Sequence, residues 1–200
     1  VMVDEATEDI TKMAAMSPSE KSYFETSVLA HAKHRIAWLL ILMFSATITG
    51  TIITRYENAF AAIPLLVSFI PMLMDTGGNC GSQSSTLIIR GIALGEIQFS
   101  DLFRVMFKEF RVSLIVGVAL ALANGIRILI MYKNAGLALV IGLSLVATIV
   151  ISKLIGCVLP LIAKKLHMDP AIMASPLITT LVDTCSILIY FNIATQVFQL

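Results

Sequence analysis

Two carboxylates stand out in this sequence, because each lies inside or directly after a long apolar stretch. Asp183 carries the one charge between Ala171 and Leu200. A charged aspartate at the centre of a membrane helix costs about 2.5–3.5 kcal/mol, so this position favours a compensating partner. A hard divalent cation, which prefers oxygen ligands, would compensate it. We therefore interpret Asp183 as the strongest candidate for a cation site.

The residues on the same helical face as Asp183 are mostly hydroxyl-bearing. They are Pro176, Thr179, Thr180, Ser186 and Tyr190. Pro176 lacks a backbone N–H, and inside a helix its ring would free carbonyl groups one turn back as ligands. The alternative to a cation site is an ion pair between Asp183 and a basic residue of another helix, Lys153 or Arg127.

The other carboxylate, Asp75, lies in the stretch Pro71–Gly95, which interrupts apolar sequence with glycines, amides and hydroxyls. Helical spacing of three or four residues places its polar side chains on one stripe. The stripe comprises Asp75, Asn79, Ser82, Gln83, Thr86 and Arg90. A polar stripe at membrane depth is tolerated where it faces protein or water, so it should line a wet path. Two glycine pairs, Gly77/Gly81 and Gly91/Gly95, should let a neighbouring helix approach closely.

Asp75 has further interpretations besides a residue that lines this path. It could be the N-cap of a helix that starts beside Thr76-Gly77. The tripeptide Asp75-Thr76-Gly77 also invites comparison with aspartic proteases, which would pair Asp75 with Asp183. We discount a protease, because three-residue motifs are frequent by chance and Asp183 has neither a preceding tyrosine nor flanking glycines. Asp169, directly before Pro170, is expected to cap the helix that follows.

Composition indicates which class of protein positions these groups. Of 200 residues, 58% are hydrophobic and 14% are charged, and the mean hydropathy is +0.90. A soluble domain of this length could not bury so much apolar surface, so we predict an all-α membrane protein. The net charge of +1 and the lack of basic runs argue against binding to nucleic acid. The cysteines, Cys80, Cys157 and Cys185, lack the spacing of a metal site.

Five apolar segments predict five transmembrane helices. They are Ile36–Thr54, Ala59–Leu94, Val112–Met131, Ala135–Ala163 and Ala171–Leu200. The second exceeds the length of one crossing, and we expect a bent but continuous helix there rather than a break at its prolines. Ile97–Arg111 mixes charged and aromatic residues, which predicts an amphipathic helix on the membrane surface. The excess of Lys and Arg on one side places the N-terminus in the cytoplasm and the C-terminus outside.

Residues 1–35 are polar and are predicted to form a cytosolic helical region ahead of a pore domain at residues 36–200. A second helix should begin near Ser17-Pro18. Glu5, Glu8 and Asp9 fall on one helical face, which is either a solvated acidic surface or a site for Mg²⁺ or Ca²⁺. No signal peptide is recognisable, and the start at Val1 suggests a piece of a longer protein.

Three stretches of this sequence together resemble one known family. They are Pro71–Gln83 followed by Arg90-Gly91, then Pro176–Asp183, and Glu5–Ile10. These stretches are similar to the second span, the last span and the connecting helix of the MgtE magnesium channels. The similarity runs through the whole chain in order.

The resemblance implies a homodimer with five spans per subunit and a pore at the subunit interface, lined by the second and fifth spans. It implies that Asp183 from both subunits binds a largely hydrated Mg²⁺, with the backbone carbonyl of Thr179 as a second contributor. Glu5, Glu8 and Asp9 would match positions that bind regulatory Mg²⁺. The family's cytosolic N and CBS domains, whose carboxylates complete that regulatory site, are expected in the full-length protein.

The predicted function is therefore a magnesium channel or transporter in the lipid bilayer, and not an enzyme. The residues expected to line its pore, besides Asp183 and Thr179, are Asp75, Asn79, Gln83, Pro176 and Thr180. The alternative is a cation- or proton-coupled secondary transporter in which Asp183 titrates. The lack of an internal repeat and of a second carboxylate in the last span favours the channel.

Overall fold

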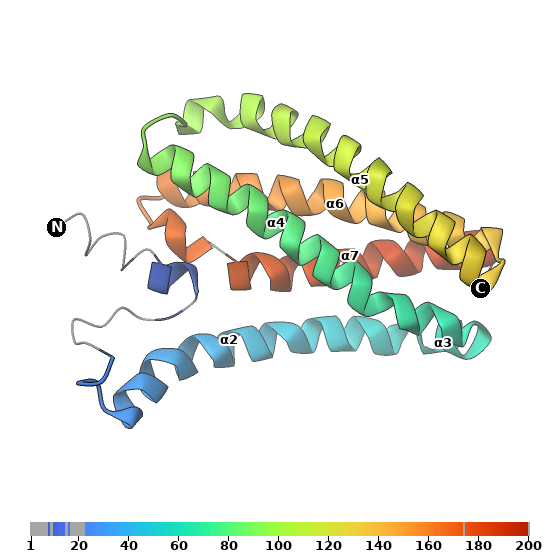
Figure 1. Cartoon of the computed structure of the whole chain (residues 1–200). Helices are drawn as coiled ribbons and strands as arrows, with labels where there is room; N and C mark the ends of the chain where they lie inside the picture. The colour runs from blue at the N-terminus through green and yellow to red at the C-terminus, as the bar shows by residue number, and fades with distance from the viewer. Residues whose placement is uncertain (1–7, 9, 15, 17–22, 174, 200) are drawn as a thin grey trace.

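A computed structural model of the chain describes residues 8, 10–14, 16, 23–173 and 175–199, and these residues contain helices and no strand (Figure 1). Five long helices alternate in direction. They are α2 (Val28–Arg55), α4 (Ile70–Ala93), α5 (Leu102–Tyr132), α6 (Ala135–Lys165) and α7 (Ser175–Phe198). Shorter pieces connect them: α3 (Glu57–Ala62) and the 3₁₀ turns η1 (Pro64–Phe69), η2 (Phe99–Asp101) and η3 (Pro170–Met173). The all-α prediction is confirmed.

Length and composition suit most of these long helices to a bilayer. Among the described residues, four segments are long and apolar enough to cross it: Val28–Arg55, Phe99–Tyr132, Ala135–Lys165 and Pro176–Phe198. The chain is therefore a multi-pass membrane protein. The helix α4, with 24 residues, is as long as α7 but carries the polar stripe, which lowers its hydropathy.

The second predicted span is broken, so the prediction of a bent but continuous helix is wrong. α3 ends at Ala62, and the chain passes through η1 before α4 begins at Ile70. Pro64 disfavours helical geometry at the residue before it, and Ile63 has φ −136° and ψ 82°. The hydroxyl of Tyr190 on α7 donates a buried 2.8 Å hydrogen bond to the carbonyl of Leu66 and so satisfies part of this irregular backbone.

The predicted surface helix at Ile97–Arg111 does not exist as a separate element. Its first residues form η2, where the Asp101 carboxylate accepts a 3.0 Å hydrogen bond from the N–H of Gln98. The rest belongs to α5, which continues without a break to Tyr132. No glycine or proline lies between Leu102 and Gly117, so nothing in the sequence stops the helix at the membrane surface.

The first and last spans also differ from their predicted bounds. α2 starts at Val28, where Ser27 accepts a hydrogen bond from the N–H of Ala30, rather than at Ile36. The predicted start near Ser17 lies outside the described residues. α7 starts at Ser175, so Pro176 occupies its first turn, where a missing N–H costs nothing. The idea that Pro176 frees carbonyls within a span is therefore wrong.

Glycines allow α4 to pack closely on α6 and α7. A Cβ added to Gly77 would lie 2.8 Å from side-chain atoms of both Thr148 and Val182, and one added to Gly81 would lie 2.7 Å from Ile178. The first glycine pair therefore makes the predicted close contact. The second pair does not, because Gly91 packs on Ile97 and Gly95 ends the helix region with φ +71°.

The helices are arranged with α4, α6 and α7 in the centre, α5 against α6, and α2 mainly against α7 (Figure 1). One apolar cluster joins η1 and the ends of α4, α5, α6 and α7, and it includes Leu66, Leu73, Ile141 and Tyr190. A smaller one joins the opposite ends of α4, α5 and α6 through Ile88, Val105, Cys157 and Leu161. The face of α4 that these contacts leave open is the polar one.

Candidate ion pathway

The polar stripe of α4 lies on the surface of the subunit. Its exposed members are Asp75, Asn79, Gln83, Thr86 and Arg90, while Ser82 is half-buried. The opposite face of α4 is buried and carries Gly77, Gly81 and Ser84 among apolar residues. The helix therefore follows the predicted pattern, with its packing face toward α6 and α7 and its polar face directed out of the subunit.

Two of the predicted residues from α4 meet two from α7 in one hollow. Asp75 and Asn79 line it from α4, and Thr179 and Asp183 line it from α7, together with Met74 and Gly78. A Cβ on Gly78 would lie 2.9 Å from the Thr179 side chain, so glycine at this position allows the close approach of the two helices. Carboxylate, amide and hydroxyl oxygens are the groups that hard divalent cations prefer.

The ligand set of this hollow suits an ion that keeps its water. The hollow is open to the surface, with a volume of about 200 Å³. Its carboxylate, amide and hydroxyl oxygens can accept hydrogen bonds from the waters of a hydrated ion, and Mg²⁺ retains its water readily. Within the described residues, no group of three or more His, Cys, Asp and Glu side chains could hold a bare metal ion.

The alternative in which a basic residue pairs with Asp183 is wrong for the described residues. The ammonium of Lys153 lies 3.2 Å from the Ser84 hydroxyl and 3.7 Å from the Glu109 carboxylate. The Arg127 guanidinium donates a 2.9 Å hydrogen bond to the side-chain carbonyl of Asn124. Among the described residues neither Lys153 nor Arg127 forms an ion pair with Asp183, so this carboxylate is available to a cation from solution.

Comparison with known proteins identifies the family. Residues 70–193, the range that holds this hollow, match the MgtE family model, described as a divalent cation transporter. The chain belongs to the MgtE family. This membership confirms the resemblance seen in the sequence and excludes the aspartic protease alternative, because the family consists of transporters.

Three MgtE proteins illustrate the relationship. A magnesium transporter MgtE of Bacillus subtilis is 39% identical over 195 residues, and that of Thermus thermophilus is 36% identical over 195 residues. The magnesium transporter MgtE of Enterococcus faecalis is 33% identical over 196 residues. These matches cover 97–98% of this chain but 43% of each relative, so the chain spans less than half the length of these MgtE proteins.

The other predicted pore residues of this MgtE chain lie outside the hollow. Gln83 is one turn further along the exposed stripe of α4. The hydroxyls of Thr179 and Thr180 both donate to the carbonyl of Pro176, at 3.0 and 2.9 Å. Thr180 and Pro176 are half-buried in the first turns of α7 and do not line the hollow.

The acidic cluster near the N-terminus is described in part. Glu5 and Asp9 lie outside the described residues. Glu8 and Asp169 both lie close to Lys12, with carboxylate oxygens 2.6 and 2.7 Å from its ammonium. Burial favours the neutral form of Asp169, but hydrogen bonds from Lys12 and the Ala171 N–H outweigh it and lower the pKa of this carboxyl. The hydrogen bonds to Asp169 and Glu8 raise the pKa of Lys12.

Asp169 caps a turn, as predicted, although the turn is η3 rather than α7. Its carboxylate accepts a 2.9 Å hydrogen bond from the N–H of Ala171. Because its other oxygen bonds Lys12, Asp169 ties the N-terminal helical residues to the turn that leads into α7. This connection was not predicted from the sequence.

One buried carboxylate was not predicted from the sequence. Glu109 falls in the predicted surface helix at Ile97–Arg111, but it is 8% exposed and faces α4 and α6 from the interior side of α5. A signal for it exists in the sequence. Val105, Glu109 and Ser113 recur every four residues and therefore lie on one face of the helix. Lys153 lies within an apolar span, where a buried ammonium needs an anionic partner.

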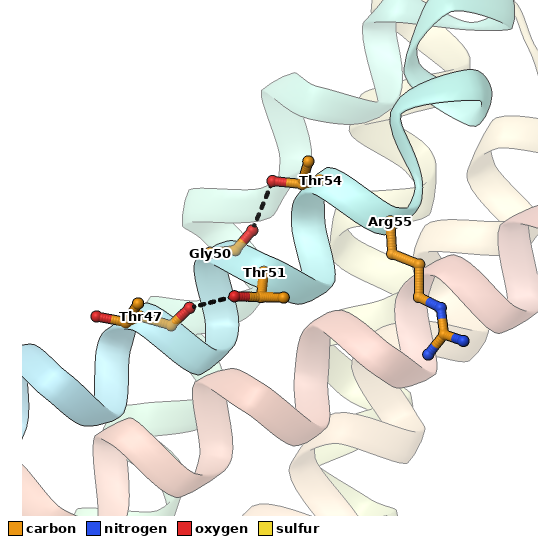
Figure 2. Close-up of a pocket in the computed structure, with 5 residues that line it drawn as sticks. All are labelled: Thr47, Gly50, Thr51, Thr54 and Arg55. Atoms are coloured by element: carbon orange, nitrogen blue, oxygen red, sulfur yellow. Dashed lines mark hydrogen bonds between the residues drawn. The ribbon is translucent and has the colours of Figure 1, made fainter.

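A larger open hollow of about 820 Å³ lies along α2 and has a different character (Figure 2). It is lined by Thr47, Gly50, Thr51, Thr54 and Arg55. Thr51 and Thr54 donate hydrogen bonds to the carbonyls of Thr47 and Gly50, at 2.9 and 3.1 Å (Figure 2). With a guanidinium and no carboxylate in its lining, this surface does not suit a cation.

Proposed function

We propose that this chain forms the membrane pore of a magnesium transporter, and that hydrated Mg²⁺ passes between two copies of the chain along α4 and α7. The observation that carries the proposal is the hollow in which Asp75 and Asn79 of α4 meet Thr179 and Asp183 of α7. It combines two negative charges with neutral oxygen ligands. The names of the curated relatives, all magnesium transporters, support Mg²⁺ as the ion.

Transport of an ion with its water follows from the charge and size of Mg²⁺. The ion is small and loses its water reluctantly, so a site that stripped it would hold it too tightly or reject it. Asp183 would act through the water shell, with the Thr179 carbonyl one turn earlier as a second contact. Asp75 would add a further negative charge on the opposite wall.

A second copy of the chain would cover the polar stripe. In one subunit this stripe is exposed along α4, from Asp75 to Arg90, on a protein whose other long helices are apolar. Polar groups at membrane depth are stable against protein or water but not against lipid. A twofold axis beside α4 and α7 would bring two Asp183 carboxylates to one path and would place Gln83 along it. Pro176 and Thr180 remain predicted pore residues.

We further propose that the N-terminus is cytoplasmic and the C-terminus outside, as the distribution of basic residues predicts. In this orientation the Lys12–Asp169 contact lies at the cytoplasmic end of α7. The cytosolic N and CBS domains of the full-length protein would act on the pore through this region, with regulatory Mg²⁺ near Glu5, Glu8 and Asp9.

The substitution Asp183→Asn tests the proposed site. It keeps the size of the side chain and its hydrogen bonding but removes one charge per subunit, so Mg²⁺ uptake into proteoliposomes should be abolished while the protein stays folded. Glu96→Gln, which neutralises an exposed carboxylate in the turn after α4, is the matched control and should transport normally. Near-normal uptake by the Asp183→Asn protein would falsify the assignment.

Two further measurements separate this proposal from its alternatives. At a clamped membrane potential, uptake by a proton-coupled secondary transporter would stop when the proton gradient is collapsed, and uptake by a cation-coupled one when its driving cation is removed. A channel would need only the electrochemical gradient of Mg²⁺. Particles that are monomeric in mild detergent and still conduct Mg²⁺ after reconstitution as monomers would rule out the shared pathway.

A further inference from the structure

A buried polar cluster joins α4, α5 and α6 on the side of α4 that faces away from the hollow. The hydroxyl of Ser84 on α4 donates a 2.6 Å hydrogen bond to the Glu109 carboxylate on α5. The ammonium of Lys153 on α6 donates a 3.2 Å hydrogen bond to the same hydroxyl and lies 3.7 Å from that carboxylate. The exposed fractions of Ser84, Glu109 and Lys153 are 0%, 8% and 5%.

We propose that Ser84, Glu109 and Lys153 fix the rotation of α4 and thereby hold its polar stripe toward the ion path. They are positioning residues, since none of them lines the hollow of Asp75 and Asp183. In a helix, neighbouring residues are about 100° apart, so a rotation by one residue that turned Ser84 outward, to the place of Gln83, would carry Gln83 to the half-buried place of Ser82. The hydrogen bond of Ser84 to two charged partners opposes such a rotation.

The chemistry of the cluster explains why it can specify one orientation. A charged pair inside the membrane is tolerated only when each ion has its partners. The Ser84 hydroxyl donates to the carboxylate and accepts from the ammonium, so it serves both ions. If α4 rotated, both ions would lose this hydroxyl. A purely apolar helix face would offer many rotations of similar energy.

A second contact one turn away limits the remaining freedom of α4. Gly81, three residues before Ser84, lies with its carbonyl against Gly156, which is three residues after Lys153. This backbone contact sets the distance between α4 and α6, while the Ser84 cluster sets the angle. Two attachments on the same face, one turn apart, define the side of α4 that can face away from the bundle.

The labelling of single cysteines measures this rotation directly. In a chain whose other cysteines are replaced by alanine, Gln83→Cys reports the exposed face and the native Cys80, 6% exposed, reports the buried face. A water-soluble thiol reagent added to proteoliposomes should modify the Gln83→Cys protein and spare Cys80. The two thiols are measured in the intact chain, and their labelling rates do not depend on which ion is transported.

Ser84→Ala removes the link to α4 and leaves the two ions beside each other. We expect it to slow labelling at Gln83→Cys by about tenfold, a change that corresponds to about 1.4 kcal/mol, and to expose Cys80. Ser113→Ala is the matched control, because Ser113 is also 0% exposed but its hydroxyl bonds the Phe110 carbonyl within α5. Equal labelling patterns in the Ser84→Ala and Ser113→Ala proteins would overturn the proposal.

A second variant tests the same rotation without leaving an unpaired buried ion that could unfold the protein. Glu109→Gln combined with Lys153→Met removes both charges together, so no unpaired ion is left, and it should shift the labelling as Ser84→Ala does. In folded protein both variants should raise the apparent KM for Mg²⁺, an effect that rests on the proposed function.

The two proposals can fail separately. If Asp183→Asn transports normally while the labelling shifts, the proposed function fails and the role of the cluster in fixing the rotation of α4 is supported. If Asp183→Asn is inactive while the labelling stays unchanged, the proposed function stands and the rotation fails.

Discussion

Gly156 on α6 lies against the backbone carbonyl of Gly81 on α4, so the two helices are in direct main-chain contact. A Cβ at position 156 would overlap that carbonyl, and backbone cannot move aside as a side chain can. We expect Gly156→Ala to destabilise the protein by about 1–3 kcal/mol, the usual cost of overpacking a core. Thermal unfolding in detergent would measure it. Gly125→Ala is the control, since no atom lies within 4 Å of the added Cβ; equal unfolding temperatures would contradict the contact.

The Tyr190–Leu66 hydrogen bond predicts a second stability effect. Tyr190→Phe keeps the ring in its apolar cluster but leaves the buried carbonyl of Leu66 without its donor. An unsatisfied buried group costs about 1–3 kcal/mol, so the unfolding temperature should fall. Tyr56→Phe removes a hydroxyl from a ring that stacks on Phe191, with centroids 4.8 Å apart, and should lower the unfolding temperature less. A Tyr190→Phe protein as stable as the wild type would show that η1 needs no support from α7.

Asp75 should contribute less to transport than Asp183 but in the same direction. Two unit charges about 4 Å apart in water interact by about 1 kcal/mol, so a carboxylate and a divalent ion interact by about 2 kcal/mol, or about thirtyfold in affinity. Asp75→Asn should therefore raise the Mg²⁺ concentration for half-maximal uptake by up to about thirtyfold and leave the maximal rate nearly unchanged. Radioisotope or fluorescence uptake over a range of Mg²⁺ concentrations would measure both. An unchanged half-maximal concentration would place Asp75 outside the path.

The contact between Lys12 and Asp169 should be insensitive to pH over a wide range. The pKa of Asp169 is lowered, so its contribution is complete above the ordinary value near 3.9 and is lost as pH falls through the lowered one. The pKa of Lys12 is raised, so its contribution is complete below about 10.4 and is lost as pH rises through the raised value. The docked state should thus persist from about pH 5 to 9.

Hydrogen exchange at the Ala171 amide would follow this contact. The N–H of Ala171 bonds Asp169, so its protection reports whether the carboxylate is still in place. Asp169→Asn should raise the exchange rate at neutral pH, and Lys12→Gln should raise it less. Exchange that changes steeply between pH 5 and 9 in the wild type would show that another group controls this turn.

The meeting of Asp75, Asn79 and Asp183 followed largely from sequence. The three- and four-residue spacing along α4 determined which side chains share a face, and one isolated carboxylate in α7 had to meet something polar. Both patterns are local, and the period of the α-helix is enough to predict which side chains share a face. The glycines at positions 77 and 81 likewise indicated the packing face of α4 correctly.

The break before α4 and the burial of Glu109 depend on partners far along the chain. Whether prolines bend or break a membrane helix depends on what satisfies the freed backbone, and here the donor is Tyr190, 124 residues after Leu66. Glu109 looked like a surface residue because charged neighbours surround it in sequence. Its burial depends on Ser84 and Lys153, which lie on two other helices.

The position of α2 at the edge of the bundle has a consequence for the order in which the protein enters the membrane. Of the five long helices α2 is made first, yet it packs mainly on α7, to which the Thr49–Thr184 hydrogen bond joins it across 135 residues. The hydroxyls of Thr47, Thr51 and Thr54 donate hydrogen bonds to carbonyls of α2 itself, so α2 can be stable in lipid before the later helices are made. In α4, by contrast, the hydroxyl of Ser84 bonds residues of α5 and α6, which are synthesised after it. We expect a chain truncated after Arg55 to integrate stably, and α4 to remain extractable until α6 has emerged.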